Sequence, residues 1–63
     1  MENRILSHLG SNDKGYSMVM EAGRHGRTFY ALYIGAALLD YYPVDDEEAE
    51  EWVQRKMRDY KIA

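Results

Sequence analysis

The side chains that could support nucleophilic or acid–base chemistry are few, and their spacing does not suit it. Nucleophilic catalysis needs a base beside the hydroxyl, but Ser7 and His8 are adjacent in sequence, so their side chains diverge on either a helix or a strand. Six carboxylates crowd residues 45–51, yet carboxylates act as acids and bases only with shifted pKa values in a cleft. These acids lie where an exposed helix is expected to begin. We therefore expect no catalytic residue and a non-enzymatic protein.

Patterns that bind metals or nucleotides are also missing from the sequence. The chain has no cysteine, and His8 and His25 have no second ligand pair near them, so we expect no metal site. Residues 12–15 lack the regular oxygen ligands and closing Glu of a calcium loop, and the sequence contains no glycine-rich phosphate loop. We therefore expect no cofactor.

One basic segment, residues 23–27, is the strongest candidate for binding an anion. Arg24, His25 and Arg27 lie on a backbone with two glycines, and this combination could hold a phosphate or contact nucleic acid. The same residues also fit a hairpin loop with solvated charges, and that is the favoured interpretation.

The formal net charge of −3 originates in the second half of the chain, where residues 31–63 contain four basic and eight acidic residues. A nucleic-acid binder normally shows a basic excess on one face, so nucleic acid is a possible partner but not the favoured one. The acidic run at 45–51 could imitate a row of phosphates and occupy a nucleic-acid channel in another protein. The favoured interpretation is a well-capped, solvated helix.

The length of 63 residues indicates one domain, near the lower limit of what folds alone. No disulfide can stabilise it, which leaves self-association or a partner. We see no signal peptide, and the longest apolar stretch, Phe29 to Leu39, is too short to cross a bilayer as a helix. The expectation is a cytoplasmic protein that does not contact a membrane.

Residues 16–42 are expected to form a three-stranded antiparallel β-meander, with strands over Tyr16–Ala22, Arg27–Ile34 and Ala37–Tyr42. The strands are rich in β-branched and aromatic residues. Gly35-Ala36 suits a two-residue turn of type II′, and Pro43 ends the last strand because it cannot donate to a central ladder.

Residues 45–61 are expected to form an amphipathic helix. Asp45 and Glu48 resemble a capping box, and Val44 with Ala49 could form a hydrophobic staple. The apolar stripe that would pack on the sheet is Ala49, Trp52, Val53, Met57 and Tyr60. Within residues 1–12, the spacing of Ile5, Leu6 and Leu9 predicts a short helix ending at Gly10, or alternatively an extended arm docked on the domain. The predicted fold class is therefore α+β.

Strand alternation divides the predicted sheet into two faces. The face assigned to the helix comprises Met18, Met20, Tyr30, Leu32, Ile34, Leu39 and Tyr41. The second face would carry Val19, Phe29, Tyr33, Leu38 and Tyr42, which is too apolar for a solvated sheet face. Its cover could be the N-terminal segment, a second copy of the chain in a homodimer, or another macromolecule. If the predicted register of the last strand is wrong by one residue, its side chains lie on the sheet faces opposite to those assigned here.

The stretch from Arg27 to Met57 reads Arg-Thr-Phe-Tyr-Ala-Leu-Tyr-Ile, a glycine turn, Leu-Leu-Asp-Tyr-Tyr, and then Asp-Asp-Glu-Glu-Ala-Glu-Glu-Trp. This layout loosely resembles the DNA-binding modules of plant AP2-type factors and of phage-type integrase amino-terminal domains. That resemblance implies a sheet that contacts the major groove. The size and layout are also similar to small phage-encoded inhibitors of host defence, including some anti-CRISPR proteins, which implies occlusion of a host surface.

The leading functional prediction is a small non-enzymatic protein-binding module. Its expected form is an accessory protein of phage or mobile-element origin that inhibits or regulates a host complex. The predicted partner contacts are Phe29, Tyr33, Leu38 and Tyr42, with Glu47, Glu50 and Glu51 as a charged rim. The alternative is a β-sheet DNA-binding module that uses Arg24, Arg27 and the strands.

Overall fold

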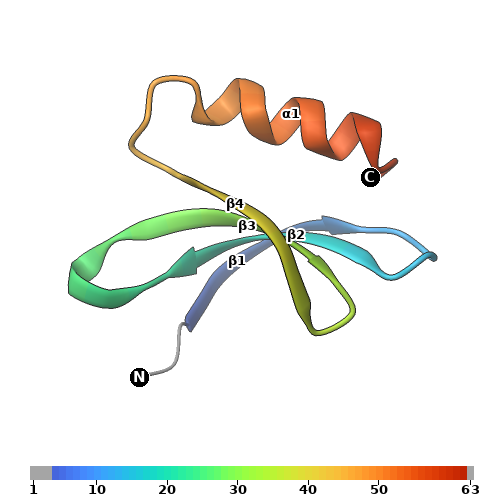
Figure 1. Ribbon diagram of the computed structural model, residues 1–63, viewed down its shortest axis with the longest axis horizontal. Coiled ribbons are helices and arrows are strands. Elements are labelled where there is room, and N and C mark those ends of the chain that lie inside the picture. The colour runs from blue at the N-terminus through green and yellow to red at the C-terminus, as the bar shows by residue number, and fades with distance from the viewer. Residues whose placement is uncertain (1–3, 63) are drawn as a thin grey trace.

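The computed structural model describes residues 4–62. The chain folds into a four-stranded antiparallel sheet with one helix packed across it (Figure 1). The strands are β1 (Arg4–Ser11), β2 (Tyr16–Ala22), β3 (Thr28–Ile34) and β4 (Ala37–Pro43), in the spatial order β1-β2-β3-β4. The helix α1 (Ala49–Asp59) follows them. The predicted α+β class, antiparallel sheet and C-terminal helix are confirmed, whereas the predicted number of three strands is wrong.

The N-terminal segment is a strand, so the prediction of a short helix there is wrong for the described residues. β1 pairs with β2 along its length, and the ladder is interrupted between Ile5 and Ser7 and again between His8 and Gly10. Each interruption adds one residue, Leu6 or Leu9, to β1. Two inserted residues convert the period-2 pattern of a strand into the spacing of a helix, which explains the mistaken prediction. Residues 1–3 of the predicted segment lie outside the described residues.

A similar bulge reverses the faces predicted for the second half of the last strand. Leu32 lies opposite Asp40 but Tyr33 lies opposite Leu38, so Leu39 is an extra residue in β4. Beyond Leu39 the alternation shifts by one residue. Tyr41 therefore lies opposite Ala31 on the face away from the helix, and the predicted faces of Tyr41 and Tyr42 are exchanged.

Tyr42 lies under α1 and contributes to the packing between helix and sheet. Its ring stacks on Trp52 with centroids 5.3 Å apart and an interplanar angle of 19°. Lys56 adds an ion pair to Asp40, another β4 residue on this face, with Nζ 3.3 Å from Oδ2. The placement of Tyr42 on the open face of the sheet is therefore wrong.

The helix begins at Ala49, four residues later than predicted, and Asp45 does not cap it. Backbone pairing continues past β4, since the Val44 N–H donates to the Thr28 carbonyl at 3.0 Å. The chain must then leave the sheet for the helix layer, and residues 45–48 make that turn. Asp46 supports the turn, because its Oδ1 accepts the Glu48 N–H at 2.8 Å and its carbonyl accepts the Ala49 N–H at 3.0 Å.

The C-terminal end of α1 turns inward and adds one more apolar side chain to the core. Lys61 has a φ of 56°, the Ile62 N–H donates to the Met57 carbonyl at 2.8 Å, and the Lys61 N–H donates to the Arg58 carbonyl at 3.2 Å. This is a Schellman motif with Lys61 in the left-handed position. It directs Ile62, which is 7% exposed, against the core.

The core lies between α1 and one face of the sheet. It consists of Met18, Leu32, Trp52, Val53 and Ile62, with Leu9, Tyr16, Tyr30, Tyr42, Met57 and Tyr60 packed around it. The predicted apolar stripe of the helix is confirmed, since Ala49, Trp52 and Val53 are buried. No helix formed by residues 4–62 has the length and apolar character needed to span a bilayer.

Candidate protein-binding face

The sheet face opposite α1, here called the open face, carries large apolar side chains in contact with solvent. Ile5 pairs with Glu21 on this face, and Leu38 and Tyr41 pair with Tyr33 and Ala31. Ile5, Leu38 and Tyr41 are 59%, 51% and 56% exposed. No helix or strand among residues 4–62 lies across this side of the sheet (Figure 1). β1 extends the face at its edge and does not cover it, so the cover predicted from Ile5, Leu6 and Leu9 is wrong for the described residues.

A hollow lies on the open face over β2, β3 and β4. Its lining residues are Glu21, Phe29, Ala31, Leu38 and Tyr41, and its volume is about 360 Å³. Phe29 and Tyr41 meet edge to face, with centroids 5.6 Å apart and an interplanar angle of 85°. These two rings and Leu38 supply an apolar wall, while Glu21 supplies a carboxylate.

The strand register places Glu21 at the floor of this hollow. Glu21 lies between Ile5 on β1 and Phe29 on β3, and it is only 6% exposed. The Tyr33 hydroxyl donates a hydrogen bond of 2.6 Å to its Oε1. That hydrogen bond, together with burial and the negative charge of Glu21, raises the pKa of Tyr33 from 10.0 to about 12. The phenol therefore stays protonated and keeps donating to the carboxylate.

The predicted aromatic and aliphatic contact residues divide between the two faces. Phe29, Tyr33 and Leu38 lie on the open face, as the strand alternation indicated. Tyr42 does not, because the Leu39 bulge turns it toward Trp52. Tyr41 and Ile5 also lie on the open face but were not predicted as contact residues. The bulges in β1 and β4 break the alternation of side chains from which the faces were predicted. Glu21 lies on this face as well, and no sequence signal showed that its carboxylate is buried.

The acidic residues of the predicted rim lie in the other layer of the molecule. Glu50 and Glu51 are in the first turn of α1, Glu47 is in the turn before it, and all three are exposed. Because α1 packs on the opposite side of the sheet, these carboxylates do not border the open face. The structure therefore separates the two halves of the predicted contact surface.

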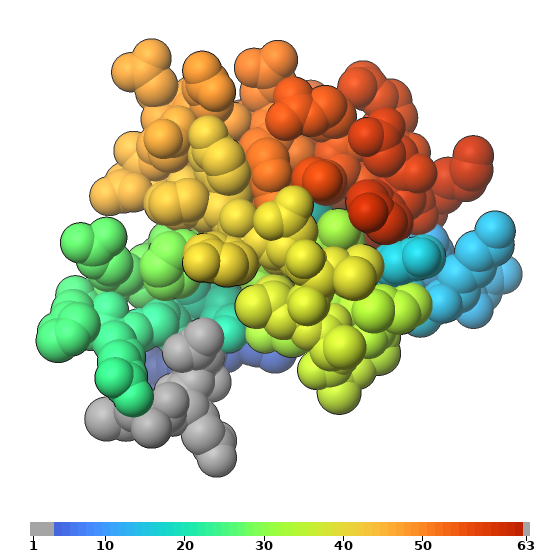
Figure 2. All heavy atoms as spheres, viewed as in Figure 1, coloured from blue at the N-terminus to red at the C-terminus, as the bar shows by residue number. Residues whose placement is uncertain are grey.

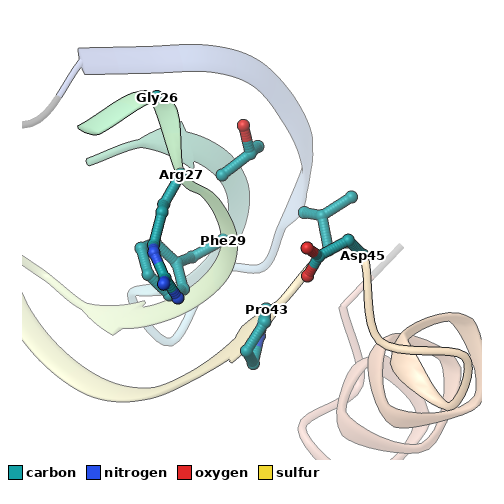
Figure 3. A pocket seen from close by; sticks show the side chains of 7 residues that line it. Gly26, Arg27, Phe29, Pro43 and Asp45 are labelled. Carbon is teal, nitrogen blue, oxygen red and sulfur yellow. The ribbon is translucent and has the colours of Figure 1, made fainter. Parts of the chain in front are cut away.

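The basic residues Arg24, His25 and Arg27 form an exposed hairpin loop between β2 and β3, as predicted. The Gly23 N–H closes this loop by donating to the Arg27 carbonyl at 2.7 Å, and His25 has a φ of 60°. Arg27 also lines a pocket of about 420 Å³ (Figure 3). Figure 3 shows Arg27 and Phe29 on one side of that pocket and Pro43 and Asp45 on the segment that leads to α1. The carboxylate of Asp45 makes this pocket a poor anion site.

The register also separates the adjacent Ser7 and His8. Ser7 pairs with Met20 and His8 pairs with Val19, so the two side chains belong to opposite faces of the sheet. Within residues 4–62, no three His, Asp or Glu side chains gather closely enough to hold a metal ion. No protein family matches the chain, and no curated protein sequence or solved structure matches it either.

Proposed function

We propose that the protein is a non-enzymatic protein-binding module and that the open face contacts the partner. The observation that carries this proposal is the exposure of Ile5, Leu38 and Tyr41 on one face, each more than half accessible to water. Contiguous apolar surface beside aromatic rings is characteristic of the buried core of protein interfaces. Tyrosine adds a phenolic hydroxyl that can hydrogen-bond at the interface edge.

The composition of the open face favours a protein over nucleic acid as the partner. The hollow is lined by Glu21 and apolar residues, and the nearest predicted basic contacts, Arg24 and Arg27, lie at the end of the sheet in the loop before β3. A duplex would place phosphates against this surface, but the lining of the hollow includes no basic side chain to contact them. The apolar side chains that do line the hollow suit an apolar protein surface.

Occlusion of another protein's surface is the mode of action that we propose for this module. Figure 2 shows the side chains of β4, in yellow, forming an uncovered strip below α1, which is in orange and red. A partner that contacts the open face would meet this edge strand as well. Inhibition or regulation of a host complex, as in the small phage inhibitors that the chain's layout is similar to, would follow from such occlusion.

The test compares charge substitutions at two neighbouring leucines of β4. Leu38 and Leu39 have similar exposure, 51% and 47%, but only Leu38 lines the hollow. We expect Leu38→Glu to abolish capture of the partner from a lysate of the native source, while Leu39→Glu retains it. Quantitative mass spectrometry of the captured proteins gives the comparison. Equal capture by both variants and the unmodified chain would overturn the assignment of the face.

A second measurement separates the protein-binding proposal from DNA binding. We expect no mobility shift of duplex DNA at low salt. Binding that weakens steeply with salt and with Arg24→Ala would establish the DNA-binding alternative instead.

A further inference from the structure

We infer that the β4 edge of the sheet is closed to the addition of another strand, and that Asp40 is the residue that closes it. An edge strand normally presents a row of unpaired N–H and C=O groups, to which a second chain can pair as a further strand. β4 is such an edge, since the strand order is β1-β2-β3-β4. The inference concerns the backbone of this edge and stands independently of the function proposed for the open face.

The alternation of an antiparallel ladder determines which backbone groups of β4 point away from β3. Residues whose N–H and C=O face the neighbouring strand alternate with residues whose groups face away from it. The Val44 N–H donates to the Thr28 carbonyl, so the backbone of Val44 faces β3. The pairing with β3 is regular from Asp40 to Pro43. The N–H and C=O positions of Tyr41 and Pro43 therefore face outward.

Neither of these outward residues leaves a donor for an added strand. The Tyr41 N–H already donates to Oδ1 of Asp40 at 2.8 Å. Pro43 has no N–H, and its carbonyl accepts the Asp46 N–H at 3.4 Å. Lys56 Nζ lies 3.3 Å from the other carboxylate oxygen of Asp40, so the ion pair holds the carboxylate that caps the edge.

Bulges disturb both edges of the sheet as well. The extra residue Leu39 breaks the regular spacing of the outward groups in β4. The opposite edge strand, β1, contains the extra residues Leu6 and Leu9, so its outward groups are also irregularly spaced. An added strand therefore finds no regular row of donors and acceptors along residues 37–43. A protein that approaches this side of the molecule contacts side chains and does not extend the sheet.

The test uses two substitutions that reopen the edge. Pro43→Thr restores a backbone N–H, and Asp40→Ala releases the N–H of Tyr41. β4 can then pair with β4 of a second copy about a two-fold axis at Tyr41. We expect this double variant to dimerise in a concentration series followed by sedimentation velocity.

The matched control combines Asp40→Asn with Pro43→Thr. Asparagine removes the same charge and the same ion pair with Lys56 as alanine does, but its side-chain carbonyl still accepts the Tyr41 N–H. We expect the alanine double variant to dimerise at least about tenfold more tightly than the asparagine double variant. Association through the open face is the same in both variants, so it does not affect the comparison. Equal dimerisation of the two, or none in either, would overturn the inference.

Amide hydrogen exchange tests the cap without requiring a dimer. In the unmodified chain, the Tyr41 N–H should exchange at least about tenfold more slowly than in an unfolded chain, although it faces away from the sheet. Asp40→Ala should remove this protection and leave that of the Val44 N–H, which bonds to Thr28. This single variant keeps the inference testable if the double variant does not fold. Unprotected exchange at Tyr41 in the unmodified chain would overturn the role of Asp40.

Discussion

Asn12 joins two parts of the molecule that lie far apart in the sequence. Its Nδ2 donates to the Tyr60 carbonyl at the end of α1 at 2.6 Å, and its Oδ1 accepts the N–H groups of Lys14 and Tyr16 at 3.0 and 3.1 Å. An amide side chain has the donor and the acceptor that these two roles require. Asn12 lies in the turn between β1 and β2, and its bond to the helix depends on tertiary structure.

Substitution of Asn12 by aspartate isolates the contact with the helix. The acceptor for the turn remains, but the donor to Tyr60 is lost and a negative charge is placed at the helix C-terminus. We expect Asn12→Asp to lower the free energy of unfolding by about 1–3 kcal/mol in urea titrations. The exposed neighbour provides the control, since Asp13→Asn should change the free energy by no more than about 0.5 kcal/mol.

The Tyr33–Glu21 pair predicts a loss of stability at alkaline pH. The folded state raises the pKa of Tyr33 from 10.0 to about 12, so the folded state holds the phenolic proton more tightly than the unfolded state. The resulting stabilisation is complete below pH 10 and is lost as the pH rises from 10 to about 12. Urea unfolding across this range should show a steeper decline for the unmodified chain than for Tyr33→Phe. Parallel declines would contradict the assignment.

At the scale of the elements, the sequence predicts the regular strands accurately and fails where the chain inserts a residue. The predicted bounds of β2 match the structure, and Gly35 has the positive φ, 58°, that the predicted turn needs. The helix predicted in place of β1 and the faces predicted for Tyr41 and Tyr42 in β4 were wrong. The inserted residues Leu6, Leu9 and Leu39 break the alternation of side chains in these two strands. A bulge is set by pairing with the neighbouring strand, so one strand's own residues do not reveal it. This also explains why Phe29 and Leu38 were found on the open face and Tyr41 was not.

Deleting Leu39 tests whether Leu39 is the extra residue of β4. The pairs Tyr33–Leu38 and Leu32–Asp40 are already in register on either side of it, so its removal leaves Tyr42 under Trp52. We expect the deletion to change the free energy of unfolding by about 1 kcal/mol or less, with little change in Trp52 fluorescence.

Deleting Tyr41 provides the contrasting case. It moves Tyr42 to the position opposite Ala31, on the open face, and removes the stack on Trp52. We expect a loss of about 3 kcal/mol or more, which would unfold a large fraction of a small domain. Equal stability of the two deletion variants would show that Leu39 is not the extra residue in this strand.

On the scale of the whole molecule, the main hydrophobic cluster among residues 4–62 lies on the helix side of the sheet, and the open face buries the smaller side chains of Val19 and Ala31. Met18 and Leu32 are fully buried beneath α1, while the open face leaves Leu38 and Tyr41 about half exposed. A domain of 63 residues buries only about 60% of the surface of its unfolded chain and is marginally stable. The exposed apolar side chains therefore contribute little to folding, which is consistent with a role in association.

Stability measurements can distinguish apolar residues that support the fold from apolar residues that are available for association. Leu38→Glu should change the free energy of unfolding by about 0.5 kcal/mol or less, since the side chain is 51% exposed. Leu32→Ala should cost about 2–5 kcal/mol, because Leu32 is 0% exposed in the core. Chemical unfolding of both variants gives the comparison. A large loss for Leu38→Glu would mean that the open face supports the fold and would weaken the case for a binding surface.

The bond from Asn12 to the end of α1 also has a consequence for the order of folding. Each strand of the sheet pairs with its neighbour in sequence, so the sheet can assemble through successive hairpins with little loop-closure entropy. The Asn12–Tyr60 contact spans 48 residues and requires the sheet turn and the helix end to be in place already. It should therefore form after the transition state. In stopped-flow measurements, removing it should accelerate unfolding while leaving the refolding rate nearly unchanged.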